Sequence, residues 1–119
     1  MIAVLDDDEP VRKALVRLLR SAGFRACSFN SGGELLAQWV SNRPDCLVLD
    51  LQMPGSSGLE VQRSLRSAGE AVPTIVITAS DEASLLQECL TAGASVCLRK
   101  PIEGALLIAA LDHAHVLRD

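Results

Sequence analysis

Long hydrophobic runs are missing from this sequence of 119 residues, although 49% of its residues are hydrophobic. No run approaches the roughly 20 consecutive apolar residues that a helix needs to cross a bilayer. The N-terminus also lacks the basic region, apolar stretch and small-residue cleavage site of a secretory signal. These absences argue against a membrane protein or a secreted protein, and we expect a cytoplasmic protein without a membrane partner.

An excess of basic residues is also absent, because 11 Lys and Arg residues face 15 Asp and Glu residues and the formal net charge is -4 at pH 7. Binding to the phosphates of a nucleic acid requires clustered Lys and Arg side chains. We therefore expect no direct nucleic acid binding by this chain. If DNA is the eventual target, another domain must contact it.

Cysteine pairs of the CxxC type are missing as well. Each of the four cysteines lies in or beside a separate apolar stretch: Cys27, Cys46, Cys89 and Cys97. Zinc sites and the disulfide frameworks of small secreted domains show a different, paired spacing. The four residues are therefore interpreted as buried structural thiols.

The length of the chain corresponds to a single domain, which would bury about two-thirds of the surface of its unfolded chain around one core. The sequence contains no internal repeat, low-complexity segment or internal linker. We expect residues 1–119 to form one domain, with no second domain among them.

Short apolar runs alternate with helical patterns along the chain. The runs lack interspersed polar residues, as expected of strands that are buried on both faces of a parallel sheet. They cover residues 2–5, 46–49, 74–77 and 95–98, and a weaker run at 25–28 suits an edge strand. Apolar residues at helical spacing predict helices over 10–22, 35–40, 61–68, 85–90 and 106–117. The alternation predicts an α/β sandwich with right-handed crossovers.

Acidic side chains follow two of the predicted strands, at the sheet edge where parallel sheets carry their functional residues. Asp6 and Asp7 follow the first strand, and Asp50 follows the third. If these strands are neighbours, three carboxylates meet, and their repulsion makes joint ionisation costly. Mg2+ would relieve this repulsion, because it prefers oxygen ligands and leaves positions open. The sequence therefore predicts a magnesium site at this edge.

The same edge carries the other groups that phosphoryl transfer requires. Thr78 and Ser80 follow the fourth strand, and Lys100 follows the fifth. A carboxylate nucleophile beside a metal ion, with an ammonium and a hydroxyl opposite, matches this reaction. Asp50 is the predicted nucleophile because it stands alone at its strand end, and Lys100 would bind a phosphoryl oxygen.

Four motifs occur together at these positions. They are LDDDEPVRKAL with Asp6 and Asp7, LVLDLQMPGSSGLE with Asp50, IVITAS with Thr78, and GASVCLRKP with Lys100 and Pro101. In their order and spacing they resemble the receiver domains of two-component response regulators, over essentially the whole chain. The resemblance implies a doubly wound, five-stranded parallel sheet of order 2-1-3-4-5 in a flavodoxin-like three-layer sandwich. Within the family, this chain looks most like the receivers of nitrogen-fixation-regulator-type helix-turn-helix transcription regulators.

The resemblance also implies a set of residue roles. Asp50 would accept a phosphoryl group from a histidine kinase or a phosphotransfer protein. Asp7, Asp50 and the backbone carbonyl of Gln52 would bind Mg2+, and Asp6 would act on the ion through water. Thr78 would contact the phosphoryl group.

Lys100 would contact the phosphoryl group as well, and the peptide bond from Lys100 to Pro101 would be cis. The side chains of Gln52 and Ser80 would tune slow autodephosphorylation. Apart from its own phosphorylation and dephosphorylation, the domain would not be an enzyme.

The output that the resemblance implies is control of a DNA-binding domain outside these residues. A stand-alone receiver, or the receiver of a hybrid kinase in a phosphorelay, is the alternative. Phosphorylation would change a partner-binding face built from the helix at 85–90, the strand at 95–98 and the helix at 106–117. This face would also allow homodimerisation.

One position departs from the family pattern. Most receivers carry Tyr or Phe three residues before the Lys, where rotation of the ring follows movement of the Thr, but this chain has Cys97 there. A thiol cannot sweep out the same volume, so the aromatic side chain that usually reports the movement of Thr78 to the outer face is missing. Cys97 is interpreted as a small core residue. Ile102, in place of the usual Phe after the Lys-Pro pair, is interpreted as a packing change.

Two other classes of protein fit the pattern less well. A phosphatase of the haloacid-dehalogenase type needs a second Asp two residues after its nucleophile, where this chain has Gln52. A nucleotide-binding module would open its first strand into a Gly-rich phosphate loop, whereas this strand opens into carboxylates. The remaining acidic residues of that stretch, Asp8 and Glu9, are predicted to start a helix.

Overall fold

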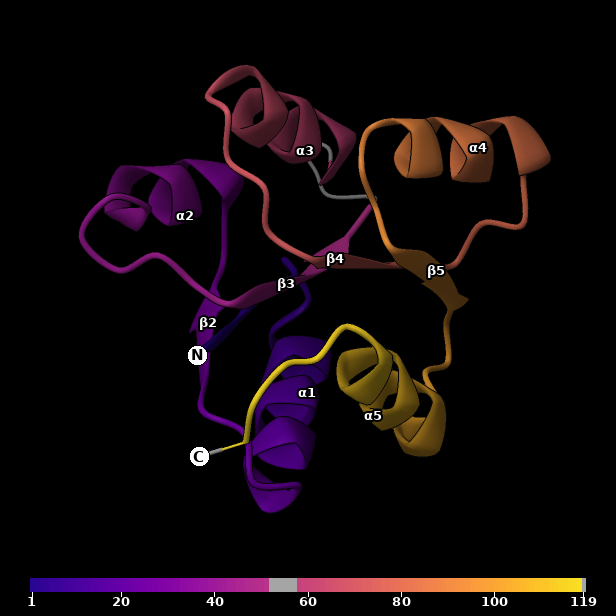
Figure 1. The fold of residues 1–119 in the computed structure, drawn as a ribbon. Coiled ribbons are helices and arrows are strands. Elements are labelled where there is room, and N and C mark those ends of the chain that lie inside the picture. The colour runs from indigo at the N-terminus through magenta and orange to yellow at the C-terminus, as the bar shows by residue number, and fades with distance from the viewer. Residues whose placement is uncertain (52–57, 119) are drawn as a thin grey trace.

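The computed structural model describes residues 1–51 and 58–118, and within them strands and helices alternate strictly (Figure 1). The strands are β1 (Ile2–Leu5), β2 (Ala26–Phe29), β3 (Cys46–Asp50), β4 (Thr74–Thr78) and β5 (Val96–Arg99). The helices are α1 (Glu9–Ser21), α2 (Gly32–Gln38), α3 (Gly58–Ser67), α4 (Ala83–Thr91) and α5 (Gly104–His113). None of the helices described here has the length and apolar character that crossing a membrane requires.

The strands form one parallel sheet in the order β2-β1-β3-β4-β5. Parallel neighbours cannot be joined by a hairpin, so a helix connects each strand to the next. Every residue of β1, β3 and β4 is buried, which explains why their sequences are apolar runs without alternation. The predicted strand order and flavodoxin-like fold are confirmed.

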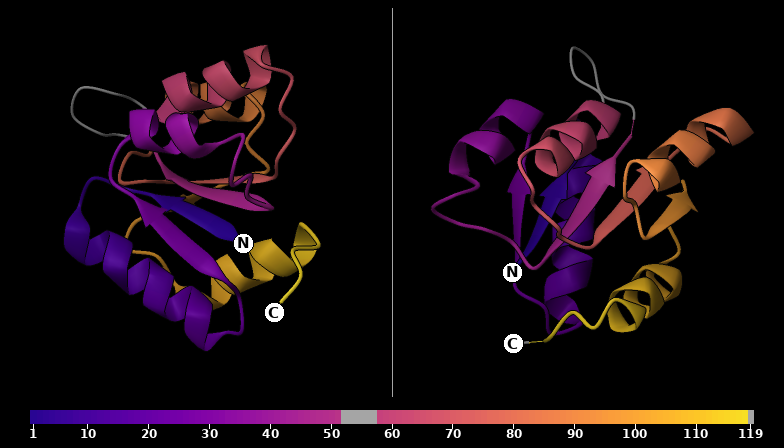
Figure 2. Two further views of the ribbon diagram at one scale, coloured as in Figure 1. Left: turned by 90° about the vertical axis from the view of Figure 1, so that its left-hand side faces the viewer. Right: turned by 45° about the horizontal axis from the view of Figure 1, so that its top comes forward.

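The sheet is the middle of three layers. Helices α1 and α5 cover one face, and α2, α3 and α4 cover the other (Figures 1 and 2). Val4 of β1 packs with Leu19 of α1 and Leu107 of α5 in the core on the first face. Leu5 and Leu35 pack in the core on the second face. Adjacent residues of β1 therefore serve opposite cores, as the period of a strand requires.

The start of α1 follows the predicted pattern. Asp8 is the N-cap, and its side chain accepts a hydrogen bond from the backbone N–H of Val11 at 3.5 Å. Glu9 lies in the first turn, where a negative charge interacts favourably with the helix dipole. Pro10 also lies there, where a missing N–H costs no helical hydrogen bond. The second pair of acidic residues therefore starts the helix.

The predicted end of the last helix was wrong, because α5 ends at His113 rather than at residue 117. His115 adopts a left-handed conformation with φ of 60°. The N–H of Val116 then donates to the carbonyl of Leu111 at 3.1 Å, and that of His115 donates to Asp112 at 3.1 Å. This Schellman motif turns Val116 back into the core beside Leu111. Without a glycine at the turn, the apolar spacing of the segment looked like continued helix.

Candidate functional site

The sheet register places the ends of β1 and β3 side by side. Leu5 pairs with Leu49, so Asp6 and Asp50, each one residue later, leave the sheet at the same edge. Asp6, Asp7 and Asp50 each offer a carboxylate oxygen, and these oxygens lie within 4.8 Å of one another. Asp6 and Asp50 are buried, with 0% and 3% of their surface exposed, whereas Asp7 is exposed. The structure therefore brings the three predicted carboxylates together.

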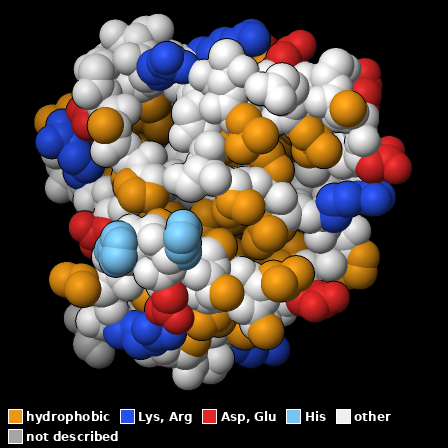
Figure 3. Space-filling view, turned by 45° about the vertical axis from the view of Figure 1, so that its right-hand side comes forward, with side chains coloured by type: hydrophobic (Ala, Val, Ile, Leu, Met, Phe, Trp, Pro, Cys, Tyr) orange, Lys and Arg blue, Asp and Glu red, His pale blue; other side chains and the backbone are white. Residues whose placement is uncertain are grey.

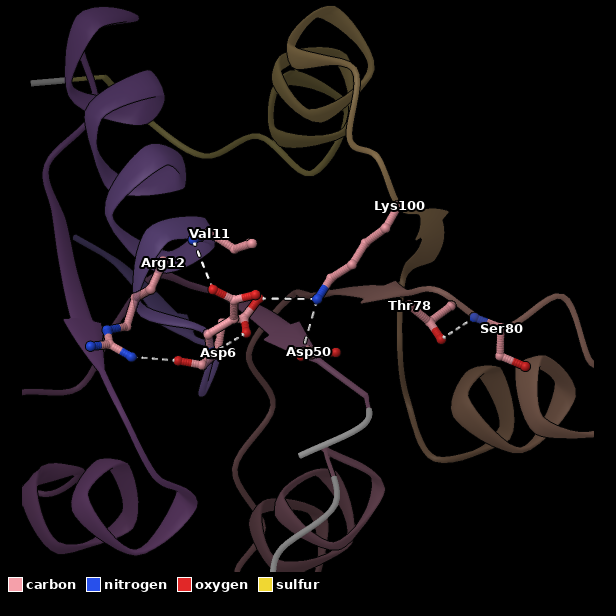
Figure 4. A network of polar contacts seen from close by, with 8 residues as sticks. Asp6, Val11, Arg12, Asp50, Thr78, Ser80 and Lys100 are labelled. Atoms are coloured by element: carbon pink, nitrogen blue, oxygen red, sulfur yellow. Dashed lines mark hydrogen bonds and ion pairs between the residues drawn. The ribbon is translucent and has the colours of Figure 1, made fainter. Parts of the chain in front are cut away.

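Lys100 reaches the same cluster from the end of β5 (Figure 4). Its Nζ atom lies 3.2 Å from Asp50 Oδ2 and 3.4 Å from Asp6 Oδ2. Burial alone would lower the pKa of the Lys100 ammonium, but the charges of Asp50 and Asp6 outweigh burial and raise that pKa above its ordinary value. The Lys100–Pro101 peptide bond is cis, as expected. Lys100 is therefore a fixed positive charge beside Asp50.

The turn after β1 is held by its own hydrogen bonds. The backbone N–H of Asp8 donates to Asp6 Oδ1 at 2.9 Å, and the Arg12 guanidinium donates to the Asp6 carbonyl at 2.8 Å (Figure 4). One oxygen of the Asp6 carboxylate is thus oriented by the chain, while the other faces Lys100. Sequence reasoning missed Arg12, because one arginine in the first turns of a helix carries no distinguishing signal.

The donor set of this cluster fits a hard divalent cation. Three carboxylates meet here and the Lys100 ammonium pairs with two of them, Asp6 and Asp50, so the negative charges of the cluster outnumber this positive charge. Asp6 Oδ2 is buried and accepts no hydrogen bond within the described residues, although the Lys100 ammonium faces it at 3.4 Å. This oxygen therefore keeps acceptor capacity for a cation or for the water bound to one. Oxygen ligands that include an exposed carboxylate and leave room for water are those that Mg2+ prefers. The arrangement satisfies the chemical requirements of a magnesium site.

Thr78 is the last residue of β4, the strand that lies next to β3 in the sheet. Its side chain is fully buried, and the neighbouring residue Ile77 pairs with Asp50. The hydroxyl oxygen of Thr78 accepts a hydrogen bond from the backbone N–H of Ser80 at 3.0 Å, and the Ser80 hydroxyl accepts one from Glu82 N–H at 3.1 Å (Figure 4). Both hydroxyls therefore organise the turn between β4 and α4. Their roles in phosphoryl chemistry stay predictions.

Gly58 packs against the backbone of Asp50 and Leu51, at the end of β3. The N–H of Gly58, the first residue of α3, donates to the Leu51 carbonyl at 2.9 Å. A Cβ atom at this position would lie 2.5 Å from the carbonyl oxygen of Asp50 and 2.9 Å from the Cα atom of Leu51. Only glycine permits this approach. Sequence analysis gave Gly58 no role, because this contact depends on how the start of α3 packs against the end of β3.

Two predicted positions need separate mention. Gln52, predicted to ligate the metal through its carbonyl and to tune dephosphorylation, lies outside the described residues. Cys97 lies in β5 and is half-buried, and it packs against the core cluster that contains Cys89. Cys46 and Cys89 are buried, whereas Cys27 and Cys97 are only partly buried. The prediction of buried thiols therefore holds fully for two of the four.

A family model described as "Response regulator receiver domain" matches residues 2–112. A curated relative, the response regulator MprA of Mycobacterium ulcerans, is 46% identical over 100 residues, which are 84% of this chain and 43% of the relative. The chain thus spans less than half the length of this relative. The same name is given to a protein of Mycobacterium leprae that is 45% identical over 100 residues, which are 84% of this chain and 44% of that relative.

Solved structures agree with these matches. A response regulator receiver protein from Burkholderia phymatum is 46% identical with a TM-score of 0.84, covering 98% of this chain and 96% of that chain. FixJ-N is 35% identical with a TM-score of 0.89, covering 99% of this chain and 95% of that one. Motifs, fold and matches agree over nearly all of the sequence. This chain belongs to the family of receiver domains of two-component response regulators.

Proposed function

We propose that Asp50 accepts a phosphoryl group and that the domain acts as a two-component switch. The observation that carries this proposal is the position of Asp50, which is buried at the end of the central strand with Lys100 Nζ at 3.2 Å and two further carboxylates beside it. The donor is the phosphohistidine of a histidine kinase or a phosphotransfer protein. The Asp50 oxygen attacks phosphorus as the bond from phosphorus to the histidine nitrogen breaks, which gives an aspartyl phosphate.

Asp7, Asp50 and the backbone carbonyl of Gln52 hold Mg2+ in this proposal, and Asp6 acts through water. The cation, when bound, neutralises charge on the phosphoryl oxygens. Two observations support this assignment. The carboxylate of Asp7 is exposed, and Asp6 Oδ2, although paired with Lys100, accepts no hydrogen bond within the described residues. The Lys100 ammonium lies beside Asp50, where the phosphoryl group is attached. It therefore stabilises the negative charge that this group brings.

The hydroxyl of Thr78 contacts a phosphoryl oxygen once the group is attached. Thr78 ends β4, adjacent to the strand of Asp50, so movement of its buried side chain is the short route by which the phosphoryl group affects the turn before α4. Ser80 belongs to this turn, and its hydroxyl accepts from Glu82 N–H. Gln52 and Ser80 tune the rate at which water removes the phosphoryl group, so the domain catalyses only its own slow dephosphorylation.

An apolar groove beside the site suits the phosphate donor. It has a volume of about 510 Å³ and is lined by Val11, Ala14, Leu15, Leu18, Lys100, Pro101 and Ile102. Lys100 lies both in this wall and against Asp50. A helix of the donor protein seated here would bring its phosphohistidine to the carboxylate edge. We assign this groove to the kinase or phosphotransfer partner.

The output face consists of α4, β5 and α5. Apolar side chains gather on this side of the molecule (Figure 3). Leu90 of α4 is 44% exposed and Leu106 of α5 is 53% exposed, while three residues of the edge strand β5 are only partly buried. Exposed apolar surface of this kind supports a partner interaction, either with a second copy of the chain or with an output domain. A DNA-binding output domain outside these residues is the proposed target, and a phosphorelay receiver is the alternative.

Phosphorylation by a small phosphate donor tests the proposal. Incubation of the protein with acetyl phosphate and Mg2+ is expected to add one phosphoryl group per chain, which intact mass spectrometry detects. The modification should be lost in Asp50→Asn, because an amide is not a nucleophile for this reaction. Chelation of the metal with EDTA should also prevent it.

The matched control is Asp45→Asn, which changes an exposed carboxylate whose partner is the N-terminal ammonium. This variant should be phosphorylated like the unchanged protein. A folded protein that takes up no phosphoryl group with Mg2+, or that takes it up equally well as Asp50→Asn, would contradict the proposal.

A further inference from the structure

Two cysteines meet at the boundary between α4 and β5. Cys89, near the end of α4, and Cys97, in β5, belong to one apolar cluster together with Leu51, Leu59 and Val76. Cys97 packs against this cluster from β5, and the two thiols lie close enough that each affects the pKa of the other. Cys97 occupies the position at which an aromatic residue was expected, and its neighbour on the helix is a second thiol.

The pair is asymmetric and separate from the other thiols. Cys89 is completely buried, whereas Cys97 is partly exposed. Cys46 is in the core on the opposite face of the sheet, and Cys27 packs in the cluster beneath α2 and α3. All four cysteines are free. The Cys97 thiol is therefore accessible to solvent, and the Cys89 thiol is buried in the same cluster.

We propose that Cys89 and Cys97 form an oxidisable dithiol, a modification site at which a peroxide or a low-molecular-weight disulfide converts the two thiols into one disulfide bond between α4 and β5. A disulfide bond holds its sulfur atoms about 2 Å apart. Side-chain rotation of two cysteines that already interact supplies the required approach. The proposal does not depend on phosphorylation of Asp50.

A peroxide oxidises the two thiols in two steps. The Cys97 thiolate attacks a peroxide oxygen, the O–O bond breaks, and the released hydroxide takes up the thiol proton as water, leaving a sulfenic acid. The Cys89 sulfur then attacks the Cys97 sulfur, the S–O bond breaks, and a second water carries away the oxygen and the Cys89 proton. The two thiols lose two electrons, and the peroxide is reduced to two molecules of water. With a low-molecular-weight disulfide, the Cys97 thiolate displaces one of its thiols to form a mixed disulfide, and Cys89 then displaces the second, so the oxidant is reduced to two thiols.

The electrostatics set the order of these steps. Burial raises the pKa of the Cys89 thiol to about 11, and the neighbouring Cys97 and Glu88 add to the increase. Glu88 is itself paired with Arg63 of α3 at 3.8 Å. Burial also raises the pKa of Cys97, but the interaction with Cys89 acts in the opposite direction. Cys97 is thus the attacking thiol and Cys89 the resolving thiol, and the reaction is slow at neutral pH.

The disulfide bond would tie α4 to the sheet at a defined point. The C-terminal end of α4 is already held by α3, because Gln62 Nε2 donates to the Cys89 carbonyl at 3.2 Å and Arg66 donates to the Thr91 carbonyl. The N-cap residue of α4, Glu82, forms no side-chain cap hydrogen bond. A disulfide bond to β5 would add a covalent link at the C-terminal end of α4, which α3 already holds. It would therefore restrict movement of the output face.

Oxidation followed by peptide mapping tests the proposal. The folded protein is treated with hydrogen peroxide or glutathione disulfide at pH 8, and remaining thiols are alkylated. The tryptic peptide 67–99 contains Cys89 and Cys97 and no other cysteine. It should lose the mass of two hydrogens, resist alkylation at both cysteines and recover both thiols after reduction. The rate should rise about tenfold per pH unit below the pKa of the attacking thiol.

Variants separate the pair from general thiol oxidation. Cys27→Ser should leave formation of the disulfide unchanged, whereas Cys97→Ser should abolish it and leave Cys89 protected by burial. Oxidation of Cys97 to a sulfinic acid without engagement of Cys89 would overturn the proposal. Loss of the Cys27 or Cys46 thiol at the same rate would overturn it too. The mapping of the unchanged protein is decisive even if a variant does not fold.

Discussion

Two regions of this domain, which meet near the end of β5, follow different rules. At the carboxyl edge of the sheet, Lys100 meets Asp50 and Asp6 in an arrangement that the family pattern describes residue by residue. On the α4–β5 face, Cys97 replaces the expected aromatic side chain and packs against the cluster that contains Cys89. The first region keeps its pattern and the second departs from it.

The difference follows from the physics of the two regions. Phosphoryl transfer requires charges at fixed positions, because electrostatic stabilisation depends on preorganised groups in a site that excludes water. A packed face requires only that apolar volume be filled, and several side chains satisfy that condition. A domain can therefore keep its chemistry while it changes how the result is transmitted. The predictions that follow test how separate the two regions are.

The largest effect is expected for Lys100→Ala. The substitution removes the ammonium 3.2 Å from Asp50 Oδ2, and loss of one preorganised charge at a reacting group lowers rates by about a hundredfold. Phosphorylation by acetyl phosphate with Mg2+, followed over time by mass spectrometry, measures this change. Lys13→Ala is the control, because that exposed ammonium only pairs with Glu9 on α1. Equal rates for the two variants would remove Lys100 from the mechanism.

A structural effect of comparable size is expected for Gly58→Ala. The new Cβ would lie 2.5 Å from the Asp50 carbonyl oxygen, so backbone must shift at the end of β3. Overpacking of this kind lowers the free energy of unfolding by about 1–3 kcal/mol, measured by urea denaturation. Gly33→Ala is the control, because the nearest atom to its Cβ would be the Ser31 hydroxyl oxygen at 4.0 Å. That helical substitution should be neutral or slightly stabilising.

The sequence was informative about the buried strands and about the residues that follow them. The apolar runs of β1, β3 and β4 identified the buried strands, because a strand covered on both faces has no polar positions. With these strands and β5 assigned to one parallel sheet, Asp6, Asp50 and Lys100 were expected at one edge. The end of α5 could not be predicted, because a left-handed His115 is set by the packing of Val116 rather than by local preference.

The remaining features depend on contacts between distant segments. Nothing in the sequence showed that Arg12 holds the Asp6 carbonyl or that Cys89 and Cys97 share one cluster, since each arrangement depends on how a helix lies on the sheet. Asp50 and Lys100 are 50 residues apart in the sequence. Their proximity could be predicted only because each lies at the end of a recognisable strand. Chemistry at strand ends was therefore predictable, and contacts between helix and sheet were not.

Alkaline pH tests the buried thiol of the core on the α1–α5 face of the sheet. Burial raises the pKa of Cys46 from 9.0 to about 12, so the folded state retains a proton that the unfolded state loses. The resulting stability is complete below pH 9 and is lost as pH rises toward 12, by about 1.4 kcal/mol per pH unit for this thiol. Urea unfolding from pH 8 to 10.5 should show the decline, and Cys46→Ala should reduce its slope. The same slope in Cys46→Ala and Cys27→Ala would contradict this origin.

The smallest effect on the chemistry is expected for Cys97→Tyr. If the carboxyl edge works independently of the α4–β5 face, restoring an aromatic side chain should change the phosphorylation rate by no more than about twofold, the usual coupling between separate sites. What should change is the response of α4, measured as the difference in amide hydrogen exchange caused by phosphorylation. Ser95→Tyr, which adds the same ring at an exposed position next to β5, should not enlarge that difference. A tenfold change in phosphorylation rate in Cys97→Tyr would show that the two regions are one coupled unit, because a side chain in the middle of β5 would then be setting the charge arrangement around Lys100.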